Sequence, residues 1–419
     1  MATKTLTRLL AGTAAFVLLS GAAAGVAQAT EGYFSLGYGV VQKGQGGAGI
    51  ADSYDAMSAT ANPAAAAGVG KELSLGIELF MPNRGYTADG TYFVPPGHVT
   101  SGDDLFLNPN IAYNLPLANG TVLNFAAYGN GGMNTDYPDG LPGCGSTFCG
   151  GPAGVDLAQL FLSATWAGNS GALSWGIAPT IAVQRFRGTG LGAFGAISTD
   201  PSNLTNNGYD YSTGLGLRLG LQYAVSDMVV LGLTGQTQFA MSKFDNYSGL
   251  FADGGSFDIP AYVGAGIAVK PDPAVTVMLD WQRIYYSQVE AVGNATDAGP
   301  LGAPGGAGFG WDDVDVLKLG VAWQQSDDMI WRAGYAHSTN PISAEDVTFN
   351  ILAPGIVENH FTFGGTRRLS SSDTLDFAIV YVPESTVSGP ETTPMGPTPG
   401  TIELEMDQLS IAVGWTRKF

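Results

Sequence analysis

Three histidines are the side chains in this sequence best suited to acid–base or metal chemistry. They stand far apart in the chain, at His98, His337 and His360. Neither a G-x-S-x-G nucleophile motif nor a phosphate-binding G-x-x-x-x-G-K-[ST] loop accompanies them, and no group of residues has the spacing of metal ligands. The sequence therefore predicts no catalytic residue, no metal site and no cofactor.

Four basic residues are candidates for binding a carboxylate, namely Arg185, Arg187, Lys243 and Arg283. They fall near the ends of predicted strands, where an arginine can hold a carboxylate with two parallel hydrogen bonds. The alternative is that they pair with the acidic residues of the chain, which outnumber the basic ones by 36 to 17. The net charge of −19 also argues against a nucleic-acid partner, which requires a basic surface.

Cys144 and Cys149 are the only cysteines, and they lie in a glycine-rich segment. In an exported protein this pair predicts a small local disulfide. Two thiols without a nearby histidine supply too few ligands for a metal ion.

The elements that must position these residues are amphipathic strands, because apolar and polar residues alternate with a period of two after about residue 72. In one segment Leu215, Leu217, Leu219, Leu221 and Tyr223 alternate with Gly216, Arg218, Gly220 and Gln222. A soluble sandwich also alternates. The long apolar faces, with Trp or Tyr near the strand ends, favour strands that cross a membrane.

Composition agrees with a membrane barrel. The chain has 61 glycines and 11% aromatic residues, but only 13% charged residues. Its mean hydropathy of +0.12 is too low for a bundle of membrane helices. A barrel accounts for both facts, because half of each strand faces a polar interior.

The lengths of the connections between strands predict how the barrel is oriented in the membrane. Strands are expected at 72–80, at 105–114 and from Thr121 onward, with about fourteen in all. Short turns alternate with long loops predicted at 81–104, 131–154, 187–209, 245–256, 289–313, 338–357 and 384–403. This asymmetry is typical of bacterial outer-membrane barrels, with short turns on the periplasmic side. The last strand ends on Phe419, and a terminal aromatic residue looks like the assembly signal of such barrels.

The N-terminus predicts export and a plug. Lys4 and Arg8 precede an apolar run, and Ala27-Gln28-Ala29 follows it, so residues 1–29 are expected to be a signal peptide. Residues 30–70 contain too much glycine for a helix and lack the alternation of a strand. We therefore expect a hatch at 30–70 that plugs the lumen of a barrel formed by 71–419.

The hatch motifs resemble those of the FadL family of outer-membrane transporters for fatty acids and other hydrophobic compounds. The matching hatch residues include Tyr33, Phe34, Gly37, Tyr38, Gly44, Gly47, Asn62, Pro63 and Ala64. The resemblance covers the whole mature chain and is weaker in the long loops. It implies an all-β, monomeric, fourteen-stranded transmembrane antiparallel barrel with an N-terminal hatch, in the outer membrane of a Gram-negative bacterium.

The resemblance also implies a route. Cargo is captured among the extracellular loops, passes to a site near the hatch and leaves sideways through a gap beside a kinked third strand. Tyr128, Gly129 and Asn130 are the candidates for this lateral opening, because glycine permits a bulge in a strand. The alternative is that Gly129 only begins the next loop.

The expected function is passive uptake of hydrophobic molecules, with long-chain fatty acids as the leading cargo and aromatic or aliphatic hydrocarbons as the alternative. Membrane lipid and lipopolysaccharide are the other expected partners. Alternatives of other classes are a general porin, an adhesin or structural barrel, and a lipid hydrolase of the outer membrane.

Overall fold

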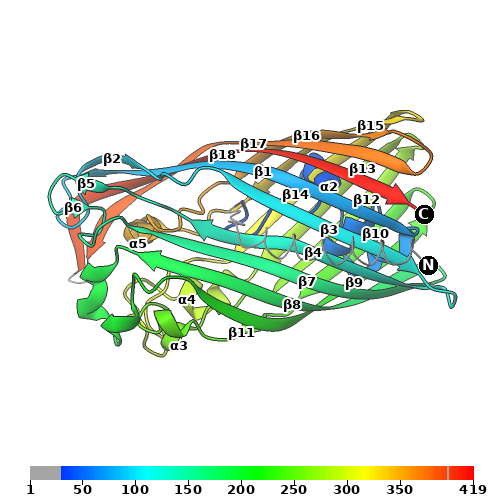
Figure 1. Cartoon of the computed structure of the whole chain (residues 1–419). Coiled ribbons are helices and arrows are strands. Elements are labelled where there is room, and N and C mark those ends of the chain that lie inside the picture. The colour runs from blue at the N-terminus through cyan, green and yellow to red at the C-terminus, as the bar shows by residue number, and fades with distance from the viewer. Residues whose placement is uncertain (1–29, 394–395) are drawn as a thin grey trace, which may run out of the picture.

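A closed antiparallel β-barrel forms the body of the protein (Figure 1). The computed structural model describes residues 30–393 and 396–419, so the predicted signal peptide lies outside the described residues. Within these ranges fourteen strands make up the wall: β1 (Glu72–Asp89), β3 (Phe106–Pro116), β4 (Thr121–Asn134), β7 (Gly154–Ser170), β8 (Leu173–Thr189), β9 (Asp210–Ser226), β10 (Val229–Gln236), β12 (Tyr262–Asp272), β13 (Val275–Ile284), β14 (Val314–Ser326), β15 (Met329–Ser338), β16 (Asn359–Arg368), β17 (Asp373–Thr393) and β18 (Gly396–Lys418).

Each strand pairs with its neighbours in sequence, and the first strand closes the barrel on the last. β1 runs antiparallel to β18, from Glu72 opposite Lys418 to Asp89 opposite Thr401. The predicted fold class is therefore confirmed. In the described part of the chain no helix has the length and apolar character needed to cross a membrane.

The alternation read from the sequence places apolar residues outside. On β9, Leu215 and Leu219 are exposed, whereas Arg218 and Gln222 are buried inside the barrel. A wall that is apolar outside and polar inside suits a lipid environment.

Two predicted loops are wrong. The first strand was expected to end at residue 80, but β1 continues to Asp89 and also pairs with the short β2 (Gly97–Thr100). The loop expected at 384–403 is the far end of the β17–β18 hairpin, which stays paired as far as Thr393 opposite Gly396. A strand that extends beyond the membrane needs no apolar face. The polar, proline-containing sequence of these extensions does not alternate, so alternation does not predict them as strands.

The remaining short elements lie in the loops and in the hatch. Small strands are β5 (Asp139–Leu141), β6 (Gly145–Ser146) and β11 (Ala240–Met241), and the helical turns of the loops are η3 (Gly192–Ile197), η4 (Pro201–Asn203), η5 (Asp245–Tyr247), α3 (Ala252–Gly255), η6 (Tyr286–Gln288), α4 (Glu290–Gly293), η7 (Ala344–Asp346) and α5 (Val347–Asn350).

The segment before β1 lies inside the barrel. It contains α2 (Val40–Gly44), η1 (Ala56–Thr60) and η2 (Pro63–Gly68). Asp55 caps η1 by accepting from the backbone N–H of Met57, and Asn62 caps η2 by accepting from that of Ala64. These caps supply local structure that the glycine-rich sequence lacks by propensity.

The hatch touches the barrel wall backbone to backbone. Inward-facing glycines on β8, β9, β10, β14 and β15 leave no room for a Cβ atom, because hatch atoms occupy that space: Gly176, Gly220, Gly232, Gly320 and Gly334. At Gly232 a Cβ would overlap the carbonyl oxygen of Ile50. The high glycine content of the chain therefore follows partly from the need to seat the hatch.

We predict that Gly232→Ala displaces the hatch. The added methyl group would overlap Ile50, at a cost of about 1–3 kcal/mol for an overpacked contact. Gly235→Ala on the same strand is the matched control, since its Cβ would lie 3.4 Å from the nearest atom. Thermal unfolding and liposome swelling with small sugars measure the effect. Equal stability and equal leakage in the two variants would contradict the close contact between the hatch and the barrel wall at Gly232.

Candidate functional site

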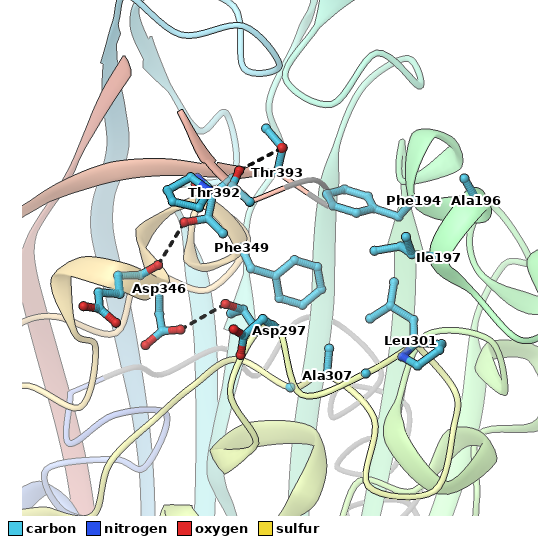
Figure 2. Close-up of a pocket in the computed structure, with 18 residues that line it drawn as sticks. Phe194, Ala196, Ile197, Asp297, Leu301, Ala307, Asp346, Phe349, Thr392 and Thr393 are labelled. Carbon is cyan, nitrogen blue, oxygen red and sulfur yellow. Dashed lines mark hydrogen bonds between the residues drawn. The ribbon is translucent and has the colours of Figure 1, made fainter. Parts of the chain in front are cut away.

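A cavity of about 440 Å³ opens among the loops at the end of the barrel away from the short turns (Figure 2). Its wall is built by η3, by the loop before β14, by η7 and α5, and by the far end of the β17–β18 hairpin. The lining residues are Phe194, Ala196, Ile197, Thr296, Asp297, Gly299, Pro300, Leu301, Ala307, Gly308, Glu345, Asp346, Thr348, Phe349, Thr392, Thr393, Gly396 and Pro397.

The chemistry of this cavity is apolar with an acidic rim. Phe194 and Phe349 pack edge to face with ring centroids 5.7 Å apart. Asp346 accepts hydrogen bonds from the hydroxyls of Thr296, at 3.1 Å, and Ser343, at 2.7 Å. Among the described residues that line the cavity, none is Lys, Arg or His. The cavity therefore suits an uncharged apolar molecule better than a carboxylate.

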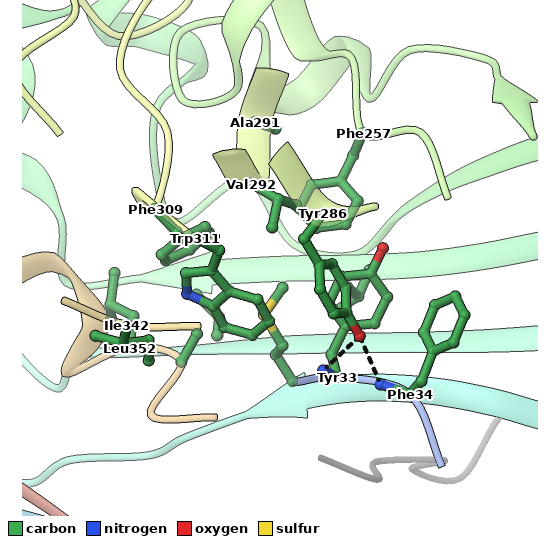
Figure 3. Close-up of a cluster of buried hydrophobic side chains, with 14 of the residues drawn as sticks. Tyr33, Phe34, Phe257, Tyr286, Ala291, Val292, Phe309, Trp311, Ile342 and Leu352 are labelled. Carbon is green, nitrogen blue, oxygen red and sulfur yellow. Dashed lines mark hydrogen bonds between the residues drawn. The ribbon is translucent and has the colours of Figure 1, made fainter. Parts of the chain in front are cut away.

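A series of aromatic rings connects the cavity with the hatch. From Phe349 the ring centroids are 5.1 Å to Phe309, then 6.4 Å to Trp311, 5.3 Å to Tyr286 and 5.0 Å to Tyr33. Figure 3 shows the lower part of this series above the hatch backbone. These side chains form a continuous apolar interior from the loops to the hatch.

Tyr286 joins this interior to the N-terminal part of the hatch. Its hydroxyl donates to the carbonyl oxygen of Glu31, at 2.6 Å. The hydroxyl oxygen of Tyr286 also accepts from the backbone N–H groups of Tyr33 and Phe34, each at 3.1 Å (Figure 3). One side chain thus makes three hydrogen bonds to the backbone of a segment that has little regular structure.

The barrel wall is interrupted beside the hatch. Pairing between β3 and β4 ends at Asn110 opposite Tyr128. Beyond that point β4 bulges between Gly129 and Gly131 in its pairing with β7. The predicted lateral-opening residues Tyr128, Gly129 and Asn130 therefore lie where β4 leaves β3, inside a strand and not in a loop.

The hatch replaces β3 as the partner of β4 at this interruption. The carbonyl oxygen of Asn130 accepts from the N–H of Ser35, and the N–H of Gly132 donates to the carbonyl of Tyr33, both at 3.1 Å. Tyr38 stacks near Tyr128, with centroids 4.7 Å apart. Movement of the hatch would therefore expose the edge of β4.

Three buried cations hold the hatch against the wall, and sequence reasoning did not single them out. Lys43 pairs with Glu78 at 3.0 Å, and Lys318 pairs with Glu31 at 2.8 Å. Arg218 donates to the hydroxyl of Tyr128 at 2.8 Å and also to the carbonyl of Thr60 in the hatch. The sequence contains a sign of two of them, because its alternation assigns Arg218 on β9 and Lys318 on β14 to the inner face of the barrel.

The four predicted carboxylate-binding residues lie away from this interior. Arg185, Arg187 and Arg283 alternate with inward residues and lie on the outer face of the barrel. Arg185 pairs with Asp156 at 3.1 Å, Arg283 with Asp313 and Asp315, and Lys243 in a loop with Asp253. None of the four lines the cavity. A cargo-binding role for them stays a prediction, and the geometry does not favour it.

Cys144 and Cys149 form a disulfide with an S–S distance of 2.07 Å. The loop that it closes buries Phe148, whose ring lies 5.2 Å from Phe194 and 5.9 Å from Phe93. The second long loop thus supports a residue that lines the cavity.

The sequence matches the family described as outer membrane protein transport protein (OMPP1/FadL/TodX) over residues 17–416. The chain belongs to this family. It is an outer-membrane transport protein for hydrophobic compounds, and the predicted family, localisation and transport class are confirmed. No curated protein matches the chain.

Solved structures agree with the FadL/TodX fold. The Pseudomonas putida toluene transporter TodX is 18% identical, with a TM-score of 0.67 over 92% of this chain and 99% of its own. A Pseudomonas aeruginosa FadL homologue is 15% identical, with a TM-score of 0.68 over 93% of this chain and 100% of its own. The Ralstonia pickettii toluene transporter TbuX is 16% identical, with a TM-score of 0.64 over 92% and 99%. At these identities the likeness concerns the fold alone.

We predict that Gly131→Ala separates the hatch from β4. A Cβ at this position would overlap the carbonyl oxygen of Tyr33, which accepts from Gly132. The lost contact should speed hydrogen exchange at Gly132 and Ser35 by about tenfold, as expected for about 1–1.5 kcal/mol. Gly70→Ala, with no atom near its Cβ, is the control. Unchanged exchange in Gly131→Ala would contradict the pairing of hatch and β4.

A second prediction concerns Glu391, which fixes the loop around Phe93. Its carboxylate accepts from the backbone N–H groups of Tyr92, Phe93 and Val94 at 2.7 to 2.8 Å. Phe93 in turn packs on Phe194 of the cavity wall, with centroids 5.4 Å apart. Burial opposes ionisation, but the donors outweigh it and hold the pKa of Glu391 below its ordinary value of 4.5.

We expect Glu391→Gln to raise hydrogen exchange of the 92–94 amides about tenfold at neutral pH, because hydrogen bonds to a charged acceptor are lost. Glu384→Gln, an exposed acid on the same strand, is the control. In the unaltered chain the loop should loosen as the pH falls below 4.5, since a carboxyl with a lowered pKa stabilises the fold above its ordinary pKa. Equal protection in both variants would contradict this role.

Proposed function

We propose that this protein carries uncharged hydrophobic molecules, aromatic or aliphatic hydrocarbons, across the outer membrane by passive uptake. The observation that supports this choice is the loop cavity, which has an apolar wall and three carboxylates, from Asp297, Glu345 and Asp346, but no basic residue among its described lining. A fatty-acid anion would meet repulsion there and no partner.

The driving force is burial of apolar surface. A methylene group gains roughly 0.8 kcal/mol when it leaves water for an apolar site. The cavity volume of about 440 Å³ lies within the range of ~300–1,000 Å³ that ligand pockets occupy. A hydrocarbon can therefore be captured by the loops without any charged contact.

The aromatic series then offers a path toward the hatch. Because side chains fill this interior in the structure, passage requires that rings such as Trp311 and Tyr286 turn aside. The interruption between β3 and β4 is the exit that we propose, with Tyr128, Gly129 and Asn130 at its edge. This exit is supported by the fact that the pairing between β3 and β4 ends at Tyr128.

Long-chain fatty acid is the second candidate cargo, and one observation favours it. Arg218 is fully buried, and its side chain donates to two tyrosine hydroxyls and a carbonyl oxygen, with no ion pair to a carboxylate in the described residues. A carboxylate that reached the hatch could pair with it.

The test is equilibrium binding of toluene and of oleate to the detergent-folded protein, each in competition with the other. We expect saturable toluene binding and oleate binding at least tenfold weaker. Ile197→Lys places an ammonium group in the cavity wall and should weaken toluene binding while strengthening oleate binding. Tyr92→Lys is the control, because Tyr92 is 78% exposed and lies outside the cavity lining.

Oleate binding that is tighter than toluene binding and that falls in Arg218→Gln would replace the hydrocarbon proposal with fatty-acid uptake. Binding of neither ligand would contradict both cargo proposals.

A further inference from the structure

Arg185 and Arg187 lie on the outer face of the barrel, above its apolar band. On β8 they continue the outward series that includes Ile177 and Ile181, which are 39% and 48% exposed. The intervening residues Gln184 and Phe186 face the interior, so the side chains of both arginines project toward the surrounding membrane.

Their height places them at the level of lipid head groups. Arg185 stands ten and Arg187 twelve positions after Trp175, which corresponds to ~33 and ~40 Å along a strand, or ~25 and ~30 Å along the barrel axis for a tilt of ~40°. An apolar band of a membrane barrel is about 25 Å tall and is bordered by aromatic residues. Tyr211, opposite Arg185 and 59% exposed, stands at this upper border.

The two guanidinium groups share one aromatic ring. Arg185 lies 4.4 Å and Arg187 4.9 Å from the ring centroid of Tyr209. The Tyr209 hydroxyl donates to Asp156 at 2.6 Å, and Arg185 pairs with the same carboxylate at 3.1 Å. The ring is thereby fixed, and the charge of Arg185 is neutralised.

Arg187 is left without a partner for its charge. It is partly exposed, and in the described residues its guanidinium forms no ion pair and no hydrogen bond. Asp103 interacts with it electrostatically from beyond ion-pair contact. A guanidinium that is held in place by stacking, with its donors unused, is prepared to bind an oxyanion.

Arg283 provides the internal comparison. It also lies on the outer face, near the same end of the barrel, but Asp315 at 2.8 Å and Asp313 at 3.2 Å neutralise it. Arg187 and Arg283 thus share the outer face and this end of the barrel, on β8 and β13, but differ in charge compensation.

We propose that Arg187, stacked on Tyr209, binds a phosphate group of lipid A in the outer leaflet of the outer membrane. The phosphates of lipopolysaccharide lie at the boundary between acyl chains and head groups, which is the level assigned to Arg187. With a net charge of −19, the chain otherwise repels this anionic leaflet. The site anchors the barrel wall in the lipid and is independent of the cargo that crosses the lumen.

The experiment measures binding of bisphosphorylated lipid A to the detergent-folded full chain by native mass spectrometry. We expect Arg187→Gln to weaken binding about tenfold, the effect of one charge-assisted contact, and Arg187→Lys to weaken it less. Arg283→Gln should change it less than twofold. The thermal unfolding temperature should be the same in all variants, which shows that the barrel is folded whatever cargo it binds and separates this result from any failure of the cargo proposal.

Dephosphorylated lipid A should bind the unaltered chain and Arg187→Gln equally. Three outcomes would overturn the proposal: a similar loss in Arg187→Gln and Arg283→Gln, equal binding of the phosphorylated and dephosphorylated lipids to the unaltered chain, or displacement of lipid A by equimolar inorganic phosphate, which would indicate a site for free phosphate.

Discussion

The contact of the hatch backbone with the barrel wall is the constraint on which the rest of this structure depends. Hatch atoms lie against inward glycines such as Gly176, Gly320 and Gly334, where a side chain would overlap them. A fourteen-stranded barrel would otherwise enclose a wide lumen. Because the hatch sits this close, the lumen can be closed without a regular domain, and the hatch needs few elements of its own.

Buried charges reinforce that seat. The pairs Lys43–Glu78 and Lys318–Glu31 join hatch and wall at two places, with both partners almost fully buried. Such pairs contribute little net stability, but breaking one leaves a buried charge that costs about 3–5 kcal/mol. They therefore favour one position of the hatch over slightly shifted ones. The same hatch segment completes the pairing of β4 where β3 leaves it, so closure of the lumen and of the wall depend on one element.

The loops add a second, apolar layer above the polar contacts between the hatch and the wall. Rings from the loops meet above the hatch, where Phe309 and Trp311 continue inward from Phe349, which lines the cavity. The cavity has acidic residues at its rim and no base in its described lining, whereas Arg218 is buried against the hatch, so the two places differ in charge. On the route that we propose, capture and passage therefore take place in different chemical environments.

The sequence by itself predicted the barrel, about fourteen strands and the outward apolar face, because a period of two is a local property. It did not reveal the paired extensions of β17 and β18, which lack alternation above the membrane. Only the tertiary structure decided the rest. Alternation places Arg187 on the outer face and Arg218 on the inner face, but it does not show that Arg187 lies over the ring of Tyr209 or that Arg218 donates to Tyr128. Strand register and neighbouring side chains decide these contacts, and residues distant in the sequence supply both.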